Sequence, residues 1–561
     1  MEAWRSEGPR RASINNFGYG GTNTHVILEE APRPSLNPVS GIRRPSHQLF
    51  LLSSRHEGAM QQMASNLKQY LQSSEETFSN QTDFANLAYT LTERRTRFPW
   101  SLAVTASGPL DLIKALELNN TQISEALHKP MRLGFVFNGQ GAQSFDMGRE
   151  LSAAYPVYRD TLKQCDDIIK SFGADWSLVT ELERNEETSR INEVKFSMPA
   201  TCALQLALVH LLIDLGIKPV AVTGHSTGEA AAAFTSGALS LHDAMAVSYF
   251  RGLVSHNHLS TGPKVVPGGM LAVGLSSSDA KHCIEEFASG KVVVACENSP
   301  SSVTLSGDME AIDKLAAAFS STGVFARKLV VQTAFHSHHM LPMQDIYRSA
   351  LQEHLSDLPE YEEKVSFFSS VTGTRIQSGH SFGPDYWVQN MTHPVLFHDS
   401  FRTMVEGQCS DGKPLQTVDA IIEVGPHSVL AGPIRQCLKS SSLNESAIAY
   451  ASCLERGQNA VITIQRLAGF LLTKGYNVNT AYLNSPNGQQ GLSIVTGLPS
   501  YVWNHSQRFW HEPRSSRELR FREDAHHDLL GVRLTGASDR APIWRYMVRT
   551  SEVMYPWSFF L

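Results

Sequence analysis

The stretch "KPVAVTGHSTGEAAAAFTSG", residues 218–237, decides the fold. It joins an apolar, strand-like run to an alanine-rich, helix-favouring run through Gly224-His225-Ser226-Thr227-Gly228, a G-x-S-x-G pattern. A strand, a sharp turn flanked by glycines and a helix together form a nucleophile elbow, in which the helix N-terminus also presents unpaired N–H groups. Ser226 is therefore predicted to be a nucleophile, the alternative being one more serine in a glycine-rich turn.

An elbow serine needs a general base and donors for an oxyanion. The run "TAFHSHHML" at 333–341 supplies His336 as the predicted base, with His338 and His339 as alternatives. The first backbone donor is assigned to Thr227, beside the serine. The second is assigned to Gln140 in "FNGQGAQ", where glycines allow a close approach to a ligand, unless this stretch is a plain glycine turn.

Arg251 lies in "AVSYFRGLVS", residues 246–255, on an otherwise apolar helical segment. A buried arginine must be paired or it destabilises the fold by several kcal/mol. A guanidinium facing an acyl pocket suits an acyl group that carries a free carboxylate, through a bidentate pair. The alternative is a salt bridge to an acidic residue at the surface.

Strands and helices alternate around the elbow, which predicts an α/β fold with strands at 132–137, 365–369 and 420–424. Residues 270–331 follow the order strand, helix, strand, strand, helix, strand of an inserted ferredoxin-like subdomain. Residues 48–130 form a small α/β unit with the order strand, helix, helix, strand. Residues 10–32 hold one strand, "THVILEE", which cannot be a domain and is expected to complete another sheet.

Composition narrows the classes of function. The 561 residues carry a net charge of −6, which gives no reason to expect nucleic acid as a partner. The most apolar helical window, 200–215, is interrupted by His210 and Asp214 and predicts a buried helix instead of a membrane span. Seven scattered cysteines without a C-x-x-C pair indicate free thiols in a reducing, cytoplasmic compartment. No metal is expected, because the histidines of "HSHH" have no partnered carboxylate motif.

The motifs "FVFNGQGAQ", "GHSTGE", "FRG", "ENSPSSVTLSGD", "AFHSHHM" and "EVGPHSVL" follow one another between Phe135 and Leu430. Together they resemble the acyltransferase domain of polyketide synthases, a relative of malonyl-CoA:acyl-carrier-protein transacylases. The resemblance implies an α/β-hydrolase-like core that transfers malonyl from malonyl-CoA, through an ester on Ser226, to the phosphopantetheine thiol of an acyl carrier protein. It implies a role in polyketide or fatty acid biosynthesis, without a bound cofactor.

The resemblance also implies roles for single residues. His336 is the base and acid, oriented by a backbone carbonyl near His393 instead of an acidic side chain. Arg251 binds the malonyl carboxylate, and the N–H groups of Gln140 and Thr227 form the oxyanion hole. Phe335, grouped with His225 as a selectivity residue, would crowd the α-methyl group of methylmalonyl. This would disfavour methylmalonyl relative to malonyl by roughly 10–200-fold. Two departures from the family pattern are Met198, where a glutamine is usual, and Gln332, where an aspartate is frequent.

The flanks resemble neighbouring parts of an iterative, highly reducing fungal-type synthase. We expect the end of a ketosynthase at 1–32, a linker domain at 33–130 and the acyltransferase at 131–455, with its ferredoxin-like subdomain at about 268–332. We expect a second linker at 456–515 and a truncated start of a dehydratase hot-dog domain at 516–561. Ketosynthase, dehydratase and carrier protein are thus the expected partners, and the chain is expected to be a fragment with one intact catalytic site.

Two rival functions remain at this point. A serine hydrolase with the same elbow predicts an acidic partner for the histidine and no role for Arg251. An inert fragment, which only scaffolds other parts of a synthase or does not fold, is suggested by the incomplete flanks.

Overall fold

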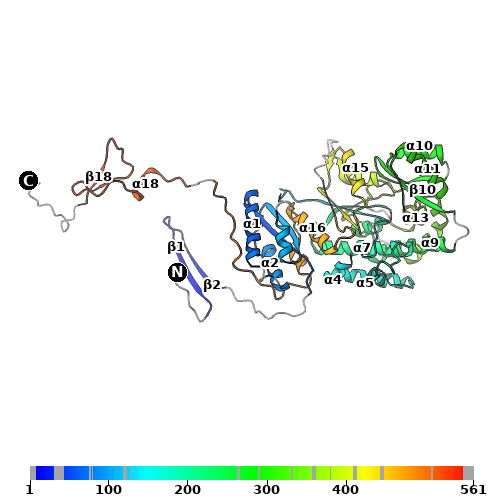
Figure 1. The fold of residues 1–561 in the computed structure, drawn as a ribbon, viewed down its shortest axis with the longest axis horizontal. Helices are drawn as coiled ribbons and strands as arrows, with labels where there is room; N and C mark the ends of the chain where they lie inside the picture. Colours follow the sequence, from blue (N-terminus) through cyan, green and yellow to red (C-terminus); the bar gives the residue numbers. More distant parts are fainter. Residues whose placement is uncertain are drawn as a thin grey trace, which may run out of the picture. The chain divides into compact units, whose positions relative to one another are not determined.

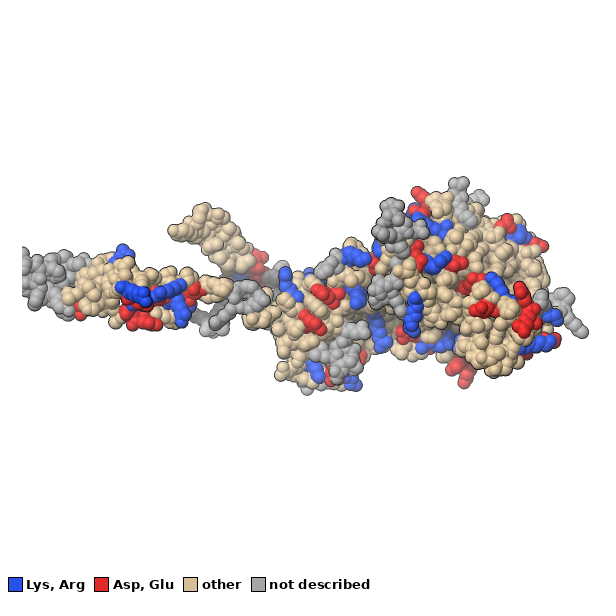
Figure 2. All heavy atoms as spheres, turned by 90° about the horizontal axis from the view of Figure 1, so that it is seen from above, with Lys and Arg blue, Asp and Glu red and all other residues tan. Residues whose placement is uncertain are grey.

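The computed structural model describes residues 8–30 and 43–547, with gaps at 75–77, 79, 118–122, 128, 262–265, 289–290, 330, 332, 357–361, 379–380, 409–413, 443–447 and 507–509. The chain divides into two compact units, Met1–Val502 and Trp503–Leu561. Lys and Arg side chains are interspersed with Asp and Glu over the face in Figure 2, as the small net charge suggests.

The core of the first unit is a five-stranded parallel sheet with the order β12-β7-β6-β15-β16. The strands are β6 (Leu133–Phe137), β7 (Pro219–Gly224), β12 (Ser366–Phe368), β15 (Ala420–Val424) and β16 (Ala449–Ser452). The strands predicted at 132–137, 365–369 and 420–424 are confirmed. Strand β16 was missed, because "AYAS" is short, half-buried and lacks the apolar run of a buried parallel strand.

The register of β6 and β7 positions the candidate site. Phe137, at the end of β6, pairs with Gly224, at the end of β7. Since the two strands are parallel, the turns that follow them emerge at the same edge of the sheet. The turn with Gln140 and the turn with Ser226 therefore lie side by side, although they are far apart in the sequence.

Helices cover this sheet, and α5 (Pro156–Ser171), α7 and α9 (Leu241–Thr261) pack together (Figure 1). Helix α7 (Val194–Asp214) confirms the predicted buried helix. It is the one helix of the described residues that is long and apolar enough to cross a membrane, and 89% of its most apolar window is buried in the fold. A core helix has the same composition, since it is apolar all round.

The other helices that flank the sheet, and a small hairpin, have the following bounds: α4 (Arg149–Ala154), α5 (Pro156–Ser171), α6 (Leu178–Glu183), α8 (Glu229–Ser236), α9 (Leu241–Thr261), α12 (Gln344–His354), α13 (Pro384–Thr392), α14 (Phe397–Val405), α15 (Ala431–Ser440), α16 (Ala460–Thr473), α17 (Thr480–Asn484), β13 (Glu406–Gln408) and β14 (Pro414–Gln416).

The inserted ferredoxin-like subdomain is confirmed. Its elements are β8 (Gly268–Val273), α10 (Ser277–Phe287), β9 (Val292–Ser299), β10 (Ser302–Asp308), α11 (Met309–Thr322) and β11 (Ala326–Lys328). They form an antiparallel sheet of the order β11-β8-β10-β9 with a hydrophobic core of its own. The chain leaves this sheet through β11 and reaches His336 directly afterwards.

The small α/β unit near the N-terminus is also confirmed. Its elements are β3 (Gln48–Ser54), α1 (Glu57–Ser73), α2 (Gln81–Glu93), β4 (Trp100–Ala106), α3 (Pro109–Ala115) and β5 (Ser124–Glu125). A separate hydrophobic core holds it together, and Val495 and Leu498 pack against that core. The backbone N–H of Val495 also donates to Thr90 Oγ1 at 2.9 Å. The chain near Val495 and Leu498 thus returns to the unit at 48–130.

The expectation of a single strand in residues 10–32 is wrong. The segment forms an antiparallel hairpin of β1 (Arg11–Phe17) and β2 (Asn23–Glu29). Strand β1 was missed because its residues "RASINNF" show no apolar alternation, and almost all its side chains are exposed. In the second unit, the described residues hold α18 (Arg514–Arg520) and a small sheet of β17 (Val532–Arg533) and β18 (Trp544–Arg545). Residues 548–561, the end of the expected dehydratase start, lie outside the described residues.

Candidate active site

Ser226 lies in the predicted strand–turn–helix. Strand β7 ends at Gly224, a short 3₁₀ turn covers Ser226–Gly228, and α8 begins at Glu229. A Cβ atom on Gly224 would lie 2.4 Å from the backbone nitrogen of Glu229, and one on Gly228 would lie 2.4 Å from the carbonyl oxygen of Phe137. Both glycines are therefore required for the chain to turn this tightly.

His336 is the histidine that the fold brings to Ser226. Its Nε2 lies 2.6 Å from Ser226 Oγ, and its Nδ1 lies 2.9 Å from the backbone carbonyl oxygen of His393. A carbonyl only accepts, so Nδ1 carries the proton and Nε2 is left as an acceptor for the serine hydroxyl. This is the orientation by a carbonyl near His393 that the resemblance implied, without an acidic side chain.

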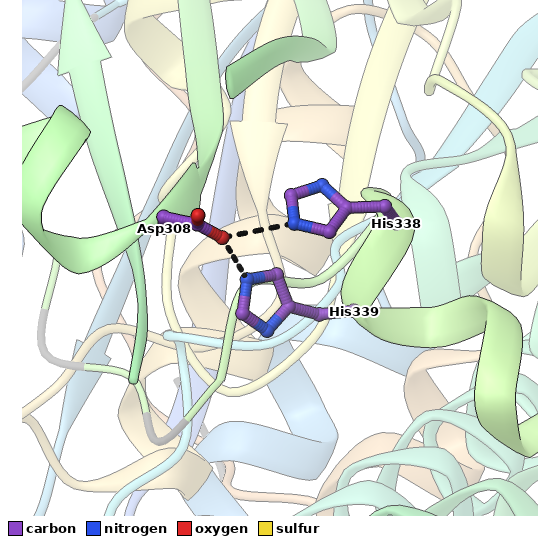
Figure 3. Close-up of side chains that lie close together, drawn as sticks. All are labelled: Asp308, His338 and His339. Carbon is purple, nitrogen blue, oxygen red and sulfur yellow. Dashed lines mark hydrogen bonds and ion pairs between the residues drawn. The ribbon is translucent and has the colours of Figure 1, made fainter. Parts of the chain in front are cut away.

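The alternatives His338 and His339 point elsewhere. The Nε2 atoms of both rings lie 2.9 Å from Oδ1 of Asp308, as Figure 3 shows. Sequence reasoning missed this carboxylate, because 30 residues separate Asp308 from His338.

His336 is suited to accept a proton at neutral pH. Its pKa is lowered well below the ordinary histidine range, chiefly by burial and then by the positive charge of Arg251, and the hydrogen bond to His393 only partly opposes this. Burial disfavours the charged imidazolium. The ring is consequently neutral at pH 7, with Nε2 free to take the serine proton.

Backbone strain coincides with this pair. Ser226 has φ 54° and His336 has φ 58°, and they are the two non-glycine residues with positive φ in the part of the chain that the structure describes. Left-handed backbone costs non-glycine residues of order 1–3 kcal/mol and is concentrated at functional sites. The surrounding fold holds both residues in this conformation.

The turn after β6 approaches the elbow closely. A Cβ atom on Gly139 would lie 2.7 Å from the carbonyl oxygen of His225 and 3.4 Å from Cβ of Ser226. The side chain of Gln140 is turned to Ser197, to whose Oγ its Nε2 donates at 2.9 Å. The backbone at Gly139 and Gln140 is thus beside Ser226, where the sequence predicted a donor turn.

Arg251, on α9, is 2% exposed and forms no ion pair with an acidic side chain of the described residues. Its Nη1 donates to Oδ1 of Asn390 at 2.5 Å, while its Nε and Nη2 are buried without a hydrogen-bond partner among the described residues. The alternative of a surface salt bridge is therefore wrong. Burial lowers the pKa of the guanidinium, whereas nearby Glu229 is among the groups that raise it.

The two unpaired donors are those that bind carboxylates elsewhere in the chain. Arg10 donates from Nε and Nη2 to the two carboxylate oxygens of Glu30, at 3.0 and 2.7 Å. Arg190 does the same to Glu193, at 2.8 Å for both bonds. Nε and Nη2 point in parallel and match the spacing of carboxylate oxygens. Arg251 thus has a buried pair of donors, Nε and Nη2, that can bind a carboxylate in bidentate fashion and that no described residue occupies.

Sequence reasoning missed Asn390 and Glu229. Asn390 donates from Nδ2 to Oε2 of Glu229 at 2.7 Å and to the carbonyl oxygen of Ser226 at 3.2 Å. Glu229 is fully buried, and burial raises its pKa to about 7 against the hydrogen bonds that it accepts from Ser370, Asn390 and Tyr386. An acidic residue on an alanine-rich, apolar helix was the available signal, since such a residue must find buried donors.

The remaining predicted residues surround this centre. His225 Nε2 lies 2.9 Å from Oδ1 of Asn298, and Phe335, beside His336, is 6% exposed. Met198 is 2% exposed, and a Cβ on Gly252, next to Arg251 in the sequence, would lie 3.4 Å from Met198 Cβ. Met198 thus belongs to the hydrophobic core near Arg251. Gln332 lies outside the described residues.

Comparison with known proteins agrees with this geometry. Residues 134–478 match the acyl transferase domain family, and residues 2–99 match the ketoacyl-synthetase C-terminal extension. The chain is 44% identical to the highly reducing polyketide synthase poxF of Penicillium oxalicum and 43% identical to the lovastatin diketide synthase mokB of Monascus pilosus. It is covered over 99% and 98% of its own length but spans 22% of each relative.

Solved structures show the same fold. The acyltransferase domain from module 8 of the salinomycin polyketide synthase has a TM-score of 0.66 at 27% identity, over 78% of this chain and 97% of that domain. The acyltransferase domain from the second module of that synthase has a TM-score of 0.59 at 29% identity, over 80% of this chain and 98% of that domain. The α/β-hydrolase-like acyltransferase fold is thereby confirmed. The chain belongs to the acyl transferase domain family.

Proposed function

We propose that the chain transfers malonyl from malonyl-CoA to the phosphopantetheine thiol of an acyl carrier protein, with Ser226 as the acylated residue. The donors Nε and Nη2 of Arg251 carry this proposal, because they match the two oxygens of a carboxylate and a malonyl thioester carries one. Asn390 contacts both Arg251 and the backbone of Ser226, so the guanidinium lies close to the nucleophile.

Charge balance supports the same substrate. A buried guanidinium with two unsatisfied donors is costly, and an incoming carboxylate removes that cost by charge-assisted hydrogen bonds. An acetyl group offers no such partner. Binding energy at Arg251 therefore favours malonyl over uncharged acyl groups of similar size.

The chemistry follows from the Ser226–His336 pair. His336 Nε2 takes the hydroxyl proton as Ser226 Oγ attacks the thioester carbonyl carbon. The oxyanion accepts hydrogen bonds from the backbone N–H groups of Gln140 and Thr227. Collapse of this intermediate breaks the carbon–sulfur bond, and the imidazolium returns the proton to the sulfur of CoA. Malonyl remains on Ser226 as an ester.

The second half-reaction reverses these steps with another thiol. His336 takes the proton of the phosphopantetheine thiol, whose sulfur attacks the ester carbonyl. The carbon–oxygen bond to Ser226 breaks, and Oγ recovers the proton from His336. No bound cofactor is needed, since malonyl-CoA is a substrate and the pantetheine belongs to the carrier protein.

Phe335 is proposed to select malonyl over methylmalonyl, with His225 beside the nucleophile as a second selectivity residue. The bulky ring of Phe335 is buried next to His336, where an added α-methyl group would meet it. One methyl group in a pocket is worth roughly 10–200-fold in specificity.

The hydrolase and the inert fragment have less support. A hydrolase triad needs an acid on the histidine, whereas Nδ1 of His336 bonds to the carbonyl of His393. An inert fragment does not account for a buried, strained serine–histidine pair beside an arginine whose Nε and Nη2 have no partner among the described residues.

The expected partners and domain limits are part of this proposal. A carrier protein, a ketosynthase and a dehydratase accompany acyltransferases in synthases, and the match at 2–99 supports a ketosynthase neighbour. In the N-terminal hairpin, Phe17 and Ile27 are 76% and 69% exposed, which suits a segment that packs on another domain. We retain the domain limits 1–32, 33–130, 131–455, 456–515 and 516–561, and a cytoplasmic location.

Intact-protein mass spectrometry after incubation with malonyl-CoA tests the function. We expect one malonyl adduct on the wild type, none on Ser226→Ala, and on Arg251→Ala a loss of malonyl with gain of acetyl from acetyl-CoA. Arg159→Ala, which removes an exposed arginine, is the matched control and should behave as wild type. A folded wild type without an adduct would refute the transferase, and undiminished malonylation of Arg251→Ala would refute the role of the arginine.

A further inference from the structure

Three side chains outside the serine–histidine pair converge on one point (Figure 3). Asp308 ends β10, and His338 and His339 begin a short 3₁₀ turn, His338–Met343. Both Nε2 atoms lie 2.9 Å from the same carboxylate oxygen, and one ligand atom from each residue lies within 4.8 Å of the others. The cluster joins the ferredoxin-like subdomain to the segment that carries His336.

The donor set suits a metal. Two imidazoles and a carboxylate are ligands that zinc-class ions prefer, and three protein ligands leave one position open.

The geometry needs little change to admit an ion. Zinc binds histidine nitrogen and carboxylate oxygen at about 2.0–2.1 Å, so tetrahedral ligands lie roughly 3.3 Å apart. The observed 2.9 Å would open by a few tenths of an ångström as the ion replaces the bridging protons. The His338 side chain is 43% exposed and that of His339 is 5% exposed, so the cluster is open to solvent on one side and fixed on the other.

We propose that Asp308, His338 and His339 bind one divalent transition-metal ion of the zinc class, with water at the open position. The ion cross-links β10 to the turn that follows His336, and thereby stabilises the junction between the subdomain and the main domain. This proposal does not rest on the transferase function. It replaces the sequence-based expectation of no metal, which depended on the absence of a carboxylate partner.

Magnesium should not bind. It prefers oxygen ligands in octahedral geometry and keeps most of its water, whereas two of the three ligands here are nitrogens. Comparing the two ions therefore separates a specific site from general attraction of cations to exposed carboxylates.

The test is titration of the whole chain with Zn²⁺, Co²⁺ or Mg²⁺ after treatment with a chelator. The variants are His338→Gln, which changes a partly exposed side chain, and Asp308→Asn. His282→Gln, an exposed histidine of α10 in the same subdomain, is the matched control. Other histidines and thiols also bind zinc, so the readout is the difference between proteins and not the total.

We expect the wild type and His282→Gln to bind one more zinc ion per chain than His338→Gln and Asp308→Asn. Co²⁺ should give visible ligand-field absorption in the first two proteins, and Zn²⁺ but not Mg²⁺ should raise their melting temperature. Equal stoichiometry and spectra in wild type and folded His338→Gln would overturn the proposal and leave a hydrogen-bonded junction only.

Discussion

Asn390 accepts a hydrogen bond from Arg251 at 2.5 Å on one side of the guanidinium, while Nε and Nη2 on the other side have no partner in the part of the chain that the structure describes. The amide that accepts from Arg251 also donates to Glu229 at 2.7 Å. Asn390 therefore links buried Glu229 to buried Arg251 and makes no hydrogen bond to Nε or Nη2 of the guanidinium. The arginine is held in place and remains available.

Replacing Asn390 with alanine should weaken malonyl loading by about 10–100-fold, because a hydrogen bond to a charged group contributes about 1.5–3 kcal/mol. Acetyl loading should change far less, since acetyl makes no use of the guanidinium. Competition between malonyl-CoA and acetyl-CoA, followed by intact mass, measures the ratio. Thr392→Ala on the same helix is the control. An equal loss for both substrates would show that Asn390 supports the elbow and not Arg251.

Replacing His336 with alanine should slow ester formation on Ser226 by about 10²–10⁴-fold, the usual contribution of a positioned base. The neighbouring contact provides a sharp control, because His393 orients the ring through its backbone carbonyl only. His393→Ala should therefore load malonyl at the wild-type rate. Rapid-quench mass spectrometry measures both rates, and a slow His393→Ala would assign that side chain a role of its own.

The pH dependence of loading follows from the depressed pKa of His336. The ring is neutral in the folded protein well below pH 6.5, so the rate of ester formation should stay on its plateau as the pH falls from 8 to below 6.5. The stability that neutral His336 contributes is complete above the unfolded pKa of about 6.5 and is lost progressively as the pH falls from there through the folded pKa. A rate that halves near pH 6.5 would contradict the burial argument.

The stability that Glu229 contributes has the opposite pH dependence, because the pKa of Glu229 is raised from 4.5 to about 7. The stability from its protonated form is complete below about pH 4.5 and is lost as the pH rises through 7. The free energy of unfolding of the wild type should therefore fall relative to that of Glu229→Gln between pH 5 and 8. Urea titrations at several pH values measure this difference, and a difference independent of pH would exclude the shift.

Replacing Phe335 with serine should raise methylmalonyl loading relative to malonyl by about 10–200-fold, the range for one methyl group in a pocket. Phe335→Leu keeps most of the bulk and should retain the preference for malonyl. Paired loading assays with malonyl-CoA and methylmalonyl-CoA measure the ratio. If both variants keep the wild-type ratio, the methyl group is excluded by another residue.

The sequence predicted the parts of the site that are local in the chain. Gly224, Ser226 and Gly228 specify the elbow by themselves, because a tight turn between a strand and a helix depends on neighbouring residues. His336 was predictable as one of three nearby histidines, but its choice needed the structure. Glu229 and Asn390 could not be paired in advance, since 161 residues separate them.

Similar limits applied to the fold. The apolar strands β6, β7 and β15 were evident from composition, whereas β1 and β16 lack an apolar pattern and form through pairing with a neighbour. Asp308 could not be paired with His338 in advance either, since 30 residues separate them. Contacts made by folding, and not by sequence proximity, decide which polar side chains meet.

The double contact of Asn390 has a consequence for the length of the acyl group. One amide touches the carbonyl oxygen of Ser226 at 3.2 Å and Nη1 of Arg251 at 2.5 Å. Under the proposed function, the acyl group is attached to Ser226 and its far carboxylate binds Arg251. The same short side chain thus positions both residues. Under the proposed function, the fixed distance between Ser226 and Arg251 selects dicarboxylic acyl groups by their length.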